Sequence, residues 1–435
     1  MSIFGAMNTA VSGLTAQSAE FANISNNVAN SQTVGYKRVD TNFIDYLTTS
    51  TPQLDASSTV VARPDYINNV QGTITQTDNP LAMAISGQGF FPVSEATGTA
   101  NGQAVFNPQP YYTRAGDFSL NNLGYLVNSA GQYLNGWSVN PTTGAVNQNA
   151  LAPIQVSQAA YDPVATSQVD LAANLPATPT PGTPITSQVQ VYDGLGNMQT
   201  VNLTWTQTSA NNWSVDVNAP NATNGPDLGT AQVAFGPGSG NAVADGTIGS
   251  VTGGTGTVTT SSYSPNGTAS LSFTANFGNG LQTIALNLGA YGASNGLTQY
   301  AGTSYTLNNL SQNGVPAGAF SNLSVDDSGN VIINYNNGQA KTIAQVPVVT
   351  FNAPNALQSQ DGQAFTATQA SGNPIANAAG SNGSGGLVTG ATEGANVDIS
   401  TEFSQLIVAQ EAYSANTKTI STADQMMQSL LNLIQ

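Results

Sequence analysis

Cysteine, histidine and long apolar runs are missing from this chain, and each absence removes a class of function. With no Cys and no His among 435 residues, disulfides, thiol nucleophiles, histidine-based triads and zinc sites with these ligands are excluded. No apolar run approaches the roughly 20 residues of a membrane-spanning helix, so we expect no membrane insertion. The N-terminal segment lacks the basic start and continuous apolar core of a secretory signal. If the protein is exported, we expect it to leave without such a cleaved signal.

Charge is the next shortage. Only 6% of the residues are charged, against roughly 25% in an ordinary soluble domain. Six basic residues oppose 22 acidic ones, which gives a formal net charge of −16. Nucleic acid is therefore a poor partner, because affinity for it comes from Lys and Arg that neutralise phosphates. A surface of neutral polar groups has few charges to hold copies apart, so it suits a subunit that packs against itself.

The two ends of the chain carry heptad patterns. The spacing predicts helices at about 3–29 and 401–433, with Asp398 or Ser400 as the N-cap of the second and Glu402 in its first turn. The apolar stripes are narrow and the helix propensity is weak, so both helices need a partner. That partner is either the other helix of one monomer or, as we expect, further copies in an assembly. The predicted assembly interface consists of Phe4, Met7, Val11, Leu14, Phe21, Val28, Phe403, Leu406, Tyr413, Ile420, Met427, Leu431 and Ile434.

The middle of the chain, about 72–390, is predicted to be β-rich. Turn-forming residues are abundant, with 45 Gly and 21 Pro in the chain, and no helical period interrupts the strand patterns. We expect hairpins at 186–207 and 331–351 and three short strands at 117–137. The Pro-rich segment 177–184 is predicted to mark a seam near the entry to a second β-unit. Residues 371–390 are interpreted as a loop, and 237–256 as an extended loop or a flexible part of the outer unit.

Candidate chemical sites are weak. The sequence DDSGN at 326–330 resembles the start of a calcium loop, but strand residues follow it at once, which favours a hairpin turn. Asp193 in YDGLGN is interpreted in the same way. The Gly-rich segments lack the Lys-Ser/Thr of a phosphate loop. Lys37 and Arg38 are an adjacent basic pair, either in a solvated turn or in a joint after the first helix. We expect no enzyme and no cofactor.

Four segments resemble the shared signatures of the bacterial flagellar rod and hook axial proteins. They are SGLTAQSAEFANISNNVANSQTVGYKR (12–38), DNPLAMAISGQGFFPV (78–93), YYTRAGDFSLNNLGYLVNSAGQYLNGW (111–137) and GANVDISTEFSQLIVAQEAYSANTKTISTADQMMQSLLNLIQ (394–435). The order and spacing of these segments match the family. Within the first segment, the resemblance identifies Asn27, Asn30, Gly35, Tyr36 and Lys37 as the family's joint motif.

The resemblance implies a mainly β protein with α-helical termini and two β-domains, the outer one inserted into the inner one. The expected parts are a coiled-coil-like helical core (1–30 and 397–435), a connecting segment (31–71 and 385–396), an inner β-domain (72–155 and 316–384) and an outer β-domain (156–315). The insertion implies a hook-type rather than a rod-type member. Such a member is a structural subunit that assembles into a flexible hollow tube and transmits torque from rod to filament.

The resemblance also implies partners and a location. The expected partners are the chain itself in a helical homopolymer, the distal rod protein, the hook cap protein, the hook–filament junction protein and the flagellar type III export apparatus. The expected location is extracellular, in the hook and basal body of the flagellum. Two alternatives stay open at this point: a distal rod subunit of the same family, and a secreted β-rich adhesin, which would have no reason to carry heptads at both ends.

Overall fold

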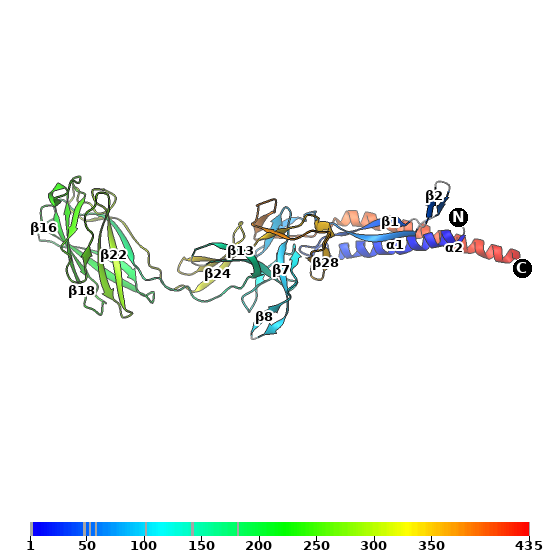
Figure 1. The fold of residues 1–435 in the computed structure, drawn as a ribbon, viewed down its shortest axis with the longest axis horizontal. Coiled ribbons are helices and arrows are strands. Elements are labelled where there is room, and N and C mark those ends of the chain that lie inside the picture. The colour runs from blue at the N-terminus through cyan, green and yellow to red at the C-terminus, as the bar shows by residue number, and fades with distance from the viewer. Residues whose placement is uncertain are drawn as a thin grey trace. The chain divides into compact units, whose positions relative to one another are not determined.

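The computed structural model describes residues 3–46, 49–51, 54–56, 59–100, 102–140, 143–180 and 182–434. The chain forms two compact units (Figure 1). The first unit contains Met1–Gln158, Ser321–Asn334 and Ala340–Gln435, and the second contains Ala159–Phe320 and Tyr335–Gln339. The second unit is thus an insertion in the sequence of the first. No helix in the described part of the chain is long and apolar enough to cross a membrane.

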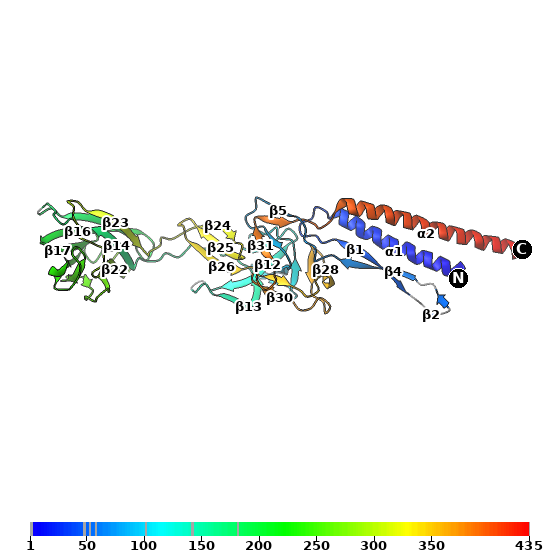
Figure 2. The same ribbon diagram turned by 90° about the horizontal axis from the view of Figure 1, so that it is seen from above.

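Two long helices form the stem of the first unit. They are α1 (Ile3–Ala29) and α2 (Ile399–Ile434), which lie side by side and run in opposite directions (Figure 2). Both predicted helices are confirmed. Asp398 is the N-cap of α2: its Oδ1 accepts a hydrogen bond from the Thr401 amide (3.0 Å), as expected for a capping carboxylate. Ser400, the other candidate, lies inside the helix.

A β-hairpin that the sequence analysis missed lies against α1. Strands β1 (Val39–Tyr46) and β4 (Thr59–Tyr66) pair antiparallel over their whole length, and β2 (Thr49–Thr51) pairs with β3 (Leu54–Ala56). Ser12 and Asn23 of α1 bond to this hairpin through the Val60 amide and the Thr41 hydroxyl. Neither strand contains a fully buried residue, and β1 shows no alternation between half-buried and exposed positions. The period-2 signal of a half-buried strand was therefore absent from the segment predicted as a plain connection.

The β-body of the first unit is built on a sheet of 12 strands among the described residues. The predicted hairpin at 331–351 is confirmed as the pair β25–β26, and the three strands predicted at 117–137 are confirmed as β10, β11 and β12. The sheet contains β7 (Phe91–Ala100), β8 (Gln103–Phe106), β9 (Tyr111–Thr113), β10 (Ser119–Leu120), β11 (Leu126–Val127), β12 (Gln132–Val139), β13 (Val146–Pro153), β24 (Phe320–Val325), β25 (Asn330–Tyr335), β26 (Ala340–Gln345), β28 (Gln358–Gln360) and β29 (Ala364–Thr366).

Three small strand pairs complete this body. They are β5 (Ile74–Gln76) with β32 (Ala391–Glu393), β6 (Met83–Ser86) with β31 (Gly386–Thr389), and β27 (Val348–Thr350) with β30 (Ile375–Asn377); η2 (Pro354–Ala356) is a short 3₁₀ turn. The segment 371–390 was interpreted as a loop, and β30 and β31 correct that interpretation. Each of these strands is only three or four residues long and pairs with a distant segment, so no local pattern marks it.

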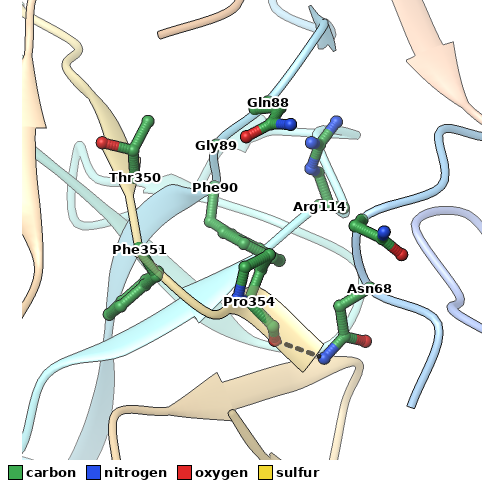
Figure 3. Close-up of a pocket in the computed structure, with 9 residues that line it drawn as sticks. Asn68, Gln88, Gly89, Phe90, Arg114, Thr350, Phe351 and Pro354 are labelled. Atoms are coloured by element: carbon green, nitrogen blue, oxygen red, sulfur yellow. Dashed lines mark hydrogen bonds between the residues drawn. The ribbon is translucent and has the colours of Figure 1, made fainter. Parts of the chain in front are cut away.

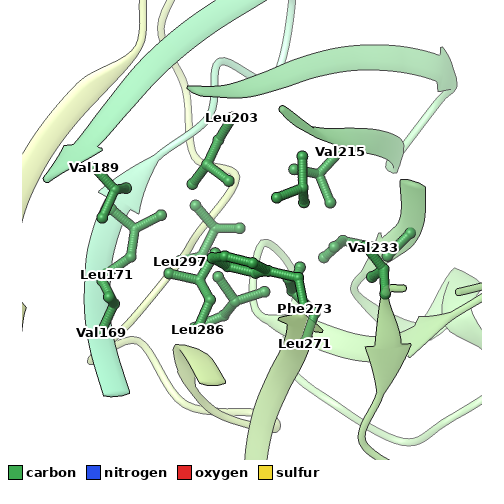
Figure 4. Packing of buried hydrophobic residues seen from close by; sticks show 14 of the residues in the cluster. Val169, Leu171, Val189, Leu203, Val215, Val233, Leu271, Phe273, Leu286 and Leu297 are labelled. Atoms are coloured by element: carbon green, nitrogen blue, oxygen red, sulfur yellow. The ribbon is translucent and has the colours of Figure 1, made fainter. Parts of the chain in front are cut away.

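The second unit consists of two five-stranded sheets that share one core (Figure 4). Its alternating residues point inward from both sheets, and Trp205 and Trp213 are fully buried. The predicted hairpin at 186–207 is confirmed as β15–β16. The strands are β14 (Gln168–Asn174), β15 (Ile185–Tyr192), β16 (Met198–Ser209), β17 (Asn212–Asn218), β18 (Asp227–Phe235), β19 (Ile248–Thr252), β20 (Thr259–Thr260), β21 (Thr268–Asn276), β22 (Leu281–Ala290) and β23 (Thr306–Gln312).

Two interpretations of loops in this unit need correction. The segment 177–184 joins β14 of one sheet to β15 of the other, so it lies inside the second unit and marks no seam between units. The segment 237–256 contains η1 (Pro237–Ser239) and the edge strand β19. The strand was overlooked because Ile248 and Val251 are the only large apolar residues that it buries in the core.

Candidate functional site

The seam between α1 and α2 is lined by small and polar residues. A Cβ on Gly13 would lie 2.8 Å from Asn416 Nδ2, so the helices approach closely there. Further along, Asn27 Nδ2 donates to Glu402 Oε2 (3.1 Å). Asn27 follows Gly13 by two heptads, and Asn416 follows Glu402 by two heptads, so one antiparallel register holds along the stem. Ala409 and Ala423 occupy the remaining positions of the α2 series and are buried.

Several large apolar side chains of the helices lie outside this seam. The sequence analysis missed the seam positions of α2, which are Glu402, Ala409, Asn416 and Ala423. It followed large apolar residues, whereas small and polar residues at heptad spacing mark the seam. Ile407 and Val408 are also exposed and were not predicted. Phe21 and Tyr413 meet edge to face across the helices, with 6.2 Å between ring centroids. Of the predicted interface, Phe4, Val11, Phe403, Tyr413 and Leu431 are exposed, Met7, Leu14, Phe21, Val28, Leu406, Ile420 and Met427 are half-buried, and the side chain of Ile434 lies outside the described part.

The joint after α1 is organised by Asn27, whose amide uses all of its hydrogen-bonding capacity. Its Oδ1 accepts from the Tyr36 hydroxyl (3.1 Å) and the Val39 amide (3.0 Å). Its Nδ2 donates to the Val39 carbonyl and to Glu402. Because an unpaired buried polar group is costly, this network fixes the exit of the chain from α1 against the start of α2.

The other predicted joint residues have distinct places. Asn30 has a local role: its Nδ2 donates to the Asn26 carbonyl, and its Oδ1 accepts from the Thr33 hydroxyl. Gly35 has φ of +71° and donates its amide to the Glu393 carbonyl (2.8 Å). Positive φ is readily adopted only by glycine. Gly35 thus lets the chain turn directly against the strand that precedes α2.

Lys37 belongs to a buried charge cluster centred on Glu393. Lys37 Nζ lies 2.6 Å from Glu393 Oε1, and Arg114 Nη1 lies 2.9 Å from Glu393 Oε2. The Gly72 amide also donates to Glu393 Oε1 (2.8 Å). All three charged side chains are buried. The cluster therefore ties together four segments that are far apart in the sequence.

Both cations donate further hydrogen bonds to backbone carbonyls. Lys37 Nζ donates to the Val70 carbonyl (2.7 Å), and Arg114 Nη2 donates to the Gly87 carbonyl (2.7 Å). Burial lowers the pKa of Lys37, and the Glu393 carboxylate opposes that effect. The interpretation of Lys37 as part of a solvated turn is therefore wrong. Sequence reasoning missed Glu393 and the second cation, Arg114, because nothing local indicates contacts between segments so far apart in the chain.

Arg114 also closes a small pocket in the β-body. Its guanidinium carbon lies 5.3 Å from the centroid of the Phe90 ring, a cation–π distance. Figure 3 shows this pair beside Asn68, whose Nδ2 donates to the Pro354 carbonyl (2.9 Å). The pocket is thus lined by Arg114 of the charge cluster and by aromatic residues of the β-body core.

Glu402 gives the joint a pH dependence. Burial raises the pKa of Glu402; Asp40 and Asp398 also raise it, while the Asn27 hydrogen bond and Arg38 lower it. The folded state therefore holds this proton more tightly than the unfolded state. The resulting stabilisation is present below the unfolded pKa and is lost as the pH rises through the folded pKa.

We expect Glu402→Gln, which keeps the shape but cannot ionise, to remove this dependence. Between about pH 4 and pH 8, wild type should lose stability relative to Glu402→Gln as the pH rises. Denaturant unfolding of both proteins at several pH values measures the difference. A difference that stays constant, or that changes in the opposite direction, would contradict the assignment.

The two acidic segments that were considered as candidate chemical sites form turns. Asp326 Oδ1 accepts from the Ser328 and Asn330 amides, and Asp193 Oδ1 accepts from the Leu195 and Asn197 amides. This is the side-chain geometry of Asx turns, which confirms the turn interpretation. Within the described ranges, no group of three Asp or Glu side chains could hold a metal ion.

A two-helix stem made from both chain ends, joined through a buried network to a β-body with an inserted β-sandwich, defines a subunit of the flagellar axial class. Family models match along the chain in order. They are "Flagella basal body rod protein" (7–37), "Flagellar hook protein FlgE/F/G D1 domain" (84–170), "Flagellar basal body protein FlaE D2 domain" (163–315) and "Flagellar basal body rod FlgEFG protein C-terminal" (388–433).

Curated relatives match over the whole length. The flagellar hook protein FlgE of Brucella suis is 32% identical and is covered fully, as is this chain. That of Salmonella typhimurium is 31% identical over 98% of both chains, and that of Rhizobium meliloti is 28% identical over the full length of both. The chain belongs to the flagellar hook protein family and is a structural subunit of the bacterial flagellar hook. The hook interpretation is thereby favoured over the distal-rod and adhesin alternatives.

Proposed function

We propose that this chain polymerises through the uncovered large side chains of its terminal helices into a flexible hollow tube, which carries motor torque from rod to filament. The observation that carries the proposal is the division of the stem into two kinds of surface. Small and polar residues close the seam within one chain, whereas Phe4, Val11 and Phe403 stay in solvent. Burying one such side chain gives roughly 1.5–3 kcal/mol. Only contacts with further copies would recover that free energy.

The proposed organisation of the subunit follows the predicted parts. Residues 1–30 and 397–435 form the helical core, 31–71 and 385–396 the connecting segment, 72–155 and 316–384 the inner β-domain, and 156–315 the outer β-domain. The observed second unit, Ala159–Phe320 with Tyr335–Gln339, supports the insertion of the outer domain. We expect the core to supply cohesion along the tube. We expect the outer domains to slide past one another through wet contacts.

The proposed partners beyond the chain itself are those of a hook. They are the distal rod protein, the hook cap protein, the hook–filament junction protein and the type III export apparatus, with the assembled protein outside the cell. We propose no enzymatic role and no cofactor. In support, the buried cations Lys37 and Arg114 both pair with the Glu393 carboxylate.

The test is the concentration needed for polymerisation. We expect Phe403→Ser to raise the critical concentration about 10- to 100-fold, because one buried large side chain is lost per interface. Sedimentation and electron microscopy of the purified full-length protein measure it. Leu281→Ser, which alters an exposed apolar residue of the second unit, is the matched control and should change little. Wild-type protein that stays monomeric at high concentration would overturn the proposal.

A further inference from the structure

Asparagine followed by glycine occurs nine times in this chain, and such pairs are prone to deamidation. The amide nitrogen of the glycine can attack the side-chain carbonyl carbon of the asparagine, because no side chain on the glycine shields its backbone. The attack requires a glycine amide that is free and a loop that can bring the two groups together. The structure describes both residues of eight of these pairs, and it separates them by the environment of the glycine amide.

In four of the eight pairs the glycine amide is already hydrogen-bonded. The amides of Gly225, Gly267 and Gly338 donate to backbone carbonyls, and the Gly314 amide donates to the Gln312 side chain. An attack by any of these nitrogens would first have to break a hydrogen bond, which slows the reaction.

Three further pairs are restrained by their surroundings. Asn135 is buried in β12, and Gly296 is buried in the second unit. The pair Asn382–Gly383 lies in a turn that is closed by hydrogen bonds from the Gly380 and Ser384 amides. The remaining pair is Asn279 with Gly280.

Asn279 and Gly280 lie in the exposed turn between β21 and β22. Gly278 and Gly280, on either side of Asn279, have φ of +96° and +106°, and nothing lies within 4 Å of the position of a Cβ on either. No described residue accepts a hydrogen bond from the Gly280 amide. The Asn279 side chain contacts Asp193, with 3.5 Å between Nδ2 and Oδ2, which is long for a hydrogen bond. This side chain is therefore free to turn towards the Gly280 amide.

We propose that Asn279 is a site of spontaneous deamidation. The Gly280 nitrogen forms a bond to Asn279 Cγ, the Cγ–Nδ2 bond breaks, and the proton of the attacking nitrogen leaves with the ammonia. Water then opens the succinimide ring at one of its two carbonyl carbons, which gives aspartate or isoaspartate. Water is the only co-reactant, and the step does not depend on polymerisation.

The new carboxylate would meet a buried charge of the same sign. Asp193 is 1% exposed and lies in the turn between β15 and β16, which belong to the other sheet of the second unit. Deamidation replaces a hydrogen-bond donor to Asp193 by a second negative charge, and like charges this close repel each other. Residues 246–325 otherwise contain no charged side chain. The modification therefore weakens the contact between the two sheets at this end of the second unit.

Peptide mapping by mass spectrometry tests the site. The purified full-length chain is incubated in buffer, and the conversion of each Asn–Gly pair is followed over time. We expect Asn279 to convert at least about fivefold faster than Asn266, because the Gly267 amide must first lose its hydrogen bond. In denaturant the two rates should converge. The proposal fails if Asn279 is no faster than Asn266 in the folded chain, or if the same difference persists in denaturant.

Asn279→Asp tests the consequence, with Asn266→Asp as the matched control. Both variants add one negative charge to a turn of the second unit, but only Asn279 contacts Asp193. In Asn279→Asp, amides of β16 and β22 should exchange hydrogen about tenfold faster than in wild type. In Asn266→Asp, exchange should stay within about twofold of wild type. Equal effects in the two variants would overturn the inferred repulsion from Asp193.

Discussion

Replacing Glu393 with alanine should lower the free energy of unfolding of the first unit by about 3–5 kcal/mol, the usual cost of removing one partner from a buried ion pair. Lys37 and Arg114 would keep their buried positions but lose their shared counter-ion, and the Gly72 amide would lose its acceptor. The second unit, which contributes nothing to this cluster, should keep its stability. Denaturant unfolding, with hydrogen exchange followed separately on peptides of each unit, measures both effects.

The matched control for Glu393 is a pair at the surface of the same joint. Arg38 Nη2 lies 3.2 Å from Asp40 Oδ2, and both side chains are partly exposed. Arg38→Gln should therefore change the free energy of unfolding by no more than about 1 kcal/mol, as is usual for surface ion pairs. If Glu393→Ala costs no more than Arg38→Gln, the buried cluster does not hold the joint together.

Gly35→Ala should destabilise the first unit by about 2–5 kcal/mol, through two independent effects. The left-handed conformation, with φ of +71°, costs an L-residue about 1–2 kcal/mol. The new methyl group would also meet the backbone of Arg114 and Ala115, and such overpacking costs about 1–3 kcal/mol more. No side-chain rotation can relieve the clash, because the obstructing atoms belong to the main chain. Thermal unfolding of the full-length protein would register the loss.

Gly131→Ala isolates the cost of the left-handed backbone conformation. Gly131 has φ of +83°, and nothing lies within 4 Å of the position that its Cβ would take. This substitution should cost only the conformational term of about 1–2 kcal/mol. Equal losses in Gly35→Ala and Gly131→Ala would mean that the close approach of Gly35 to Arg114 and Ala115 carries no energetic weight.

The sequence predicted those elements that local patterns encode. The helices follow from heptads, and the hairpins β15–β16 and β25–β26 follow from alternating apolar residues around Asx turns. Strands β1 and β4 contain no fully buried residue that would mark a core face, and their register depends on pairing and on α1. Strands β30 and β31 are too short to produce a period. The strands that were missed are those whose formation depends on pairing with distant segments and not on a local pattern.

The candidate site divides in the same way. Asn27, Gly35 and Lys37 could be singled out because they lie in one short segment after α1. Glu393 and Arg114 could not, because a single sequence does not indicate which of 22 acidic residues a buried lysine will meet. The seam of the stem was hidden for another reason: Ala409 and Ala423 resemble ordinary helix formers until their heptad spacing is compared with that of Glu402 and Asn416.

The joint has a consequence for quality control during biogenesis. Lys37 and Glu393 are separated by 356 positions in the chain, so a chain threaded through a narrow conduit from either end cannot complete the joint until nearly all of it has emerged. A prematurely terminated chain that ends before position 393 lacks both the carboxylate and α2. Such a fragment has no stem to present to the growing structure. Under the proposed assembly through the stem, a complete polypeptide is therefore a condition of incorporation.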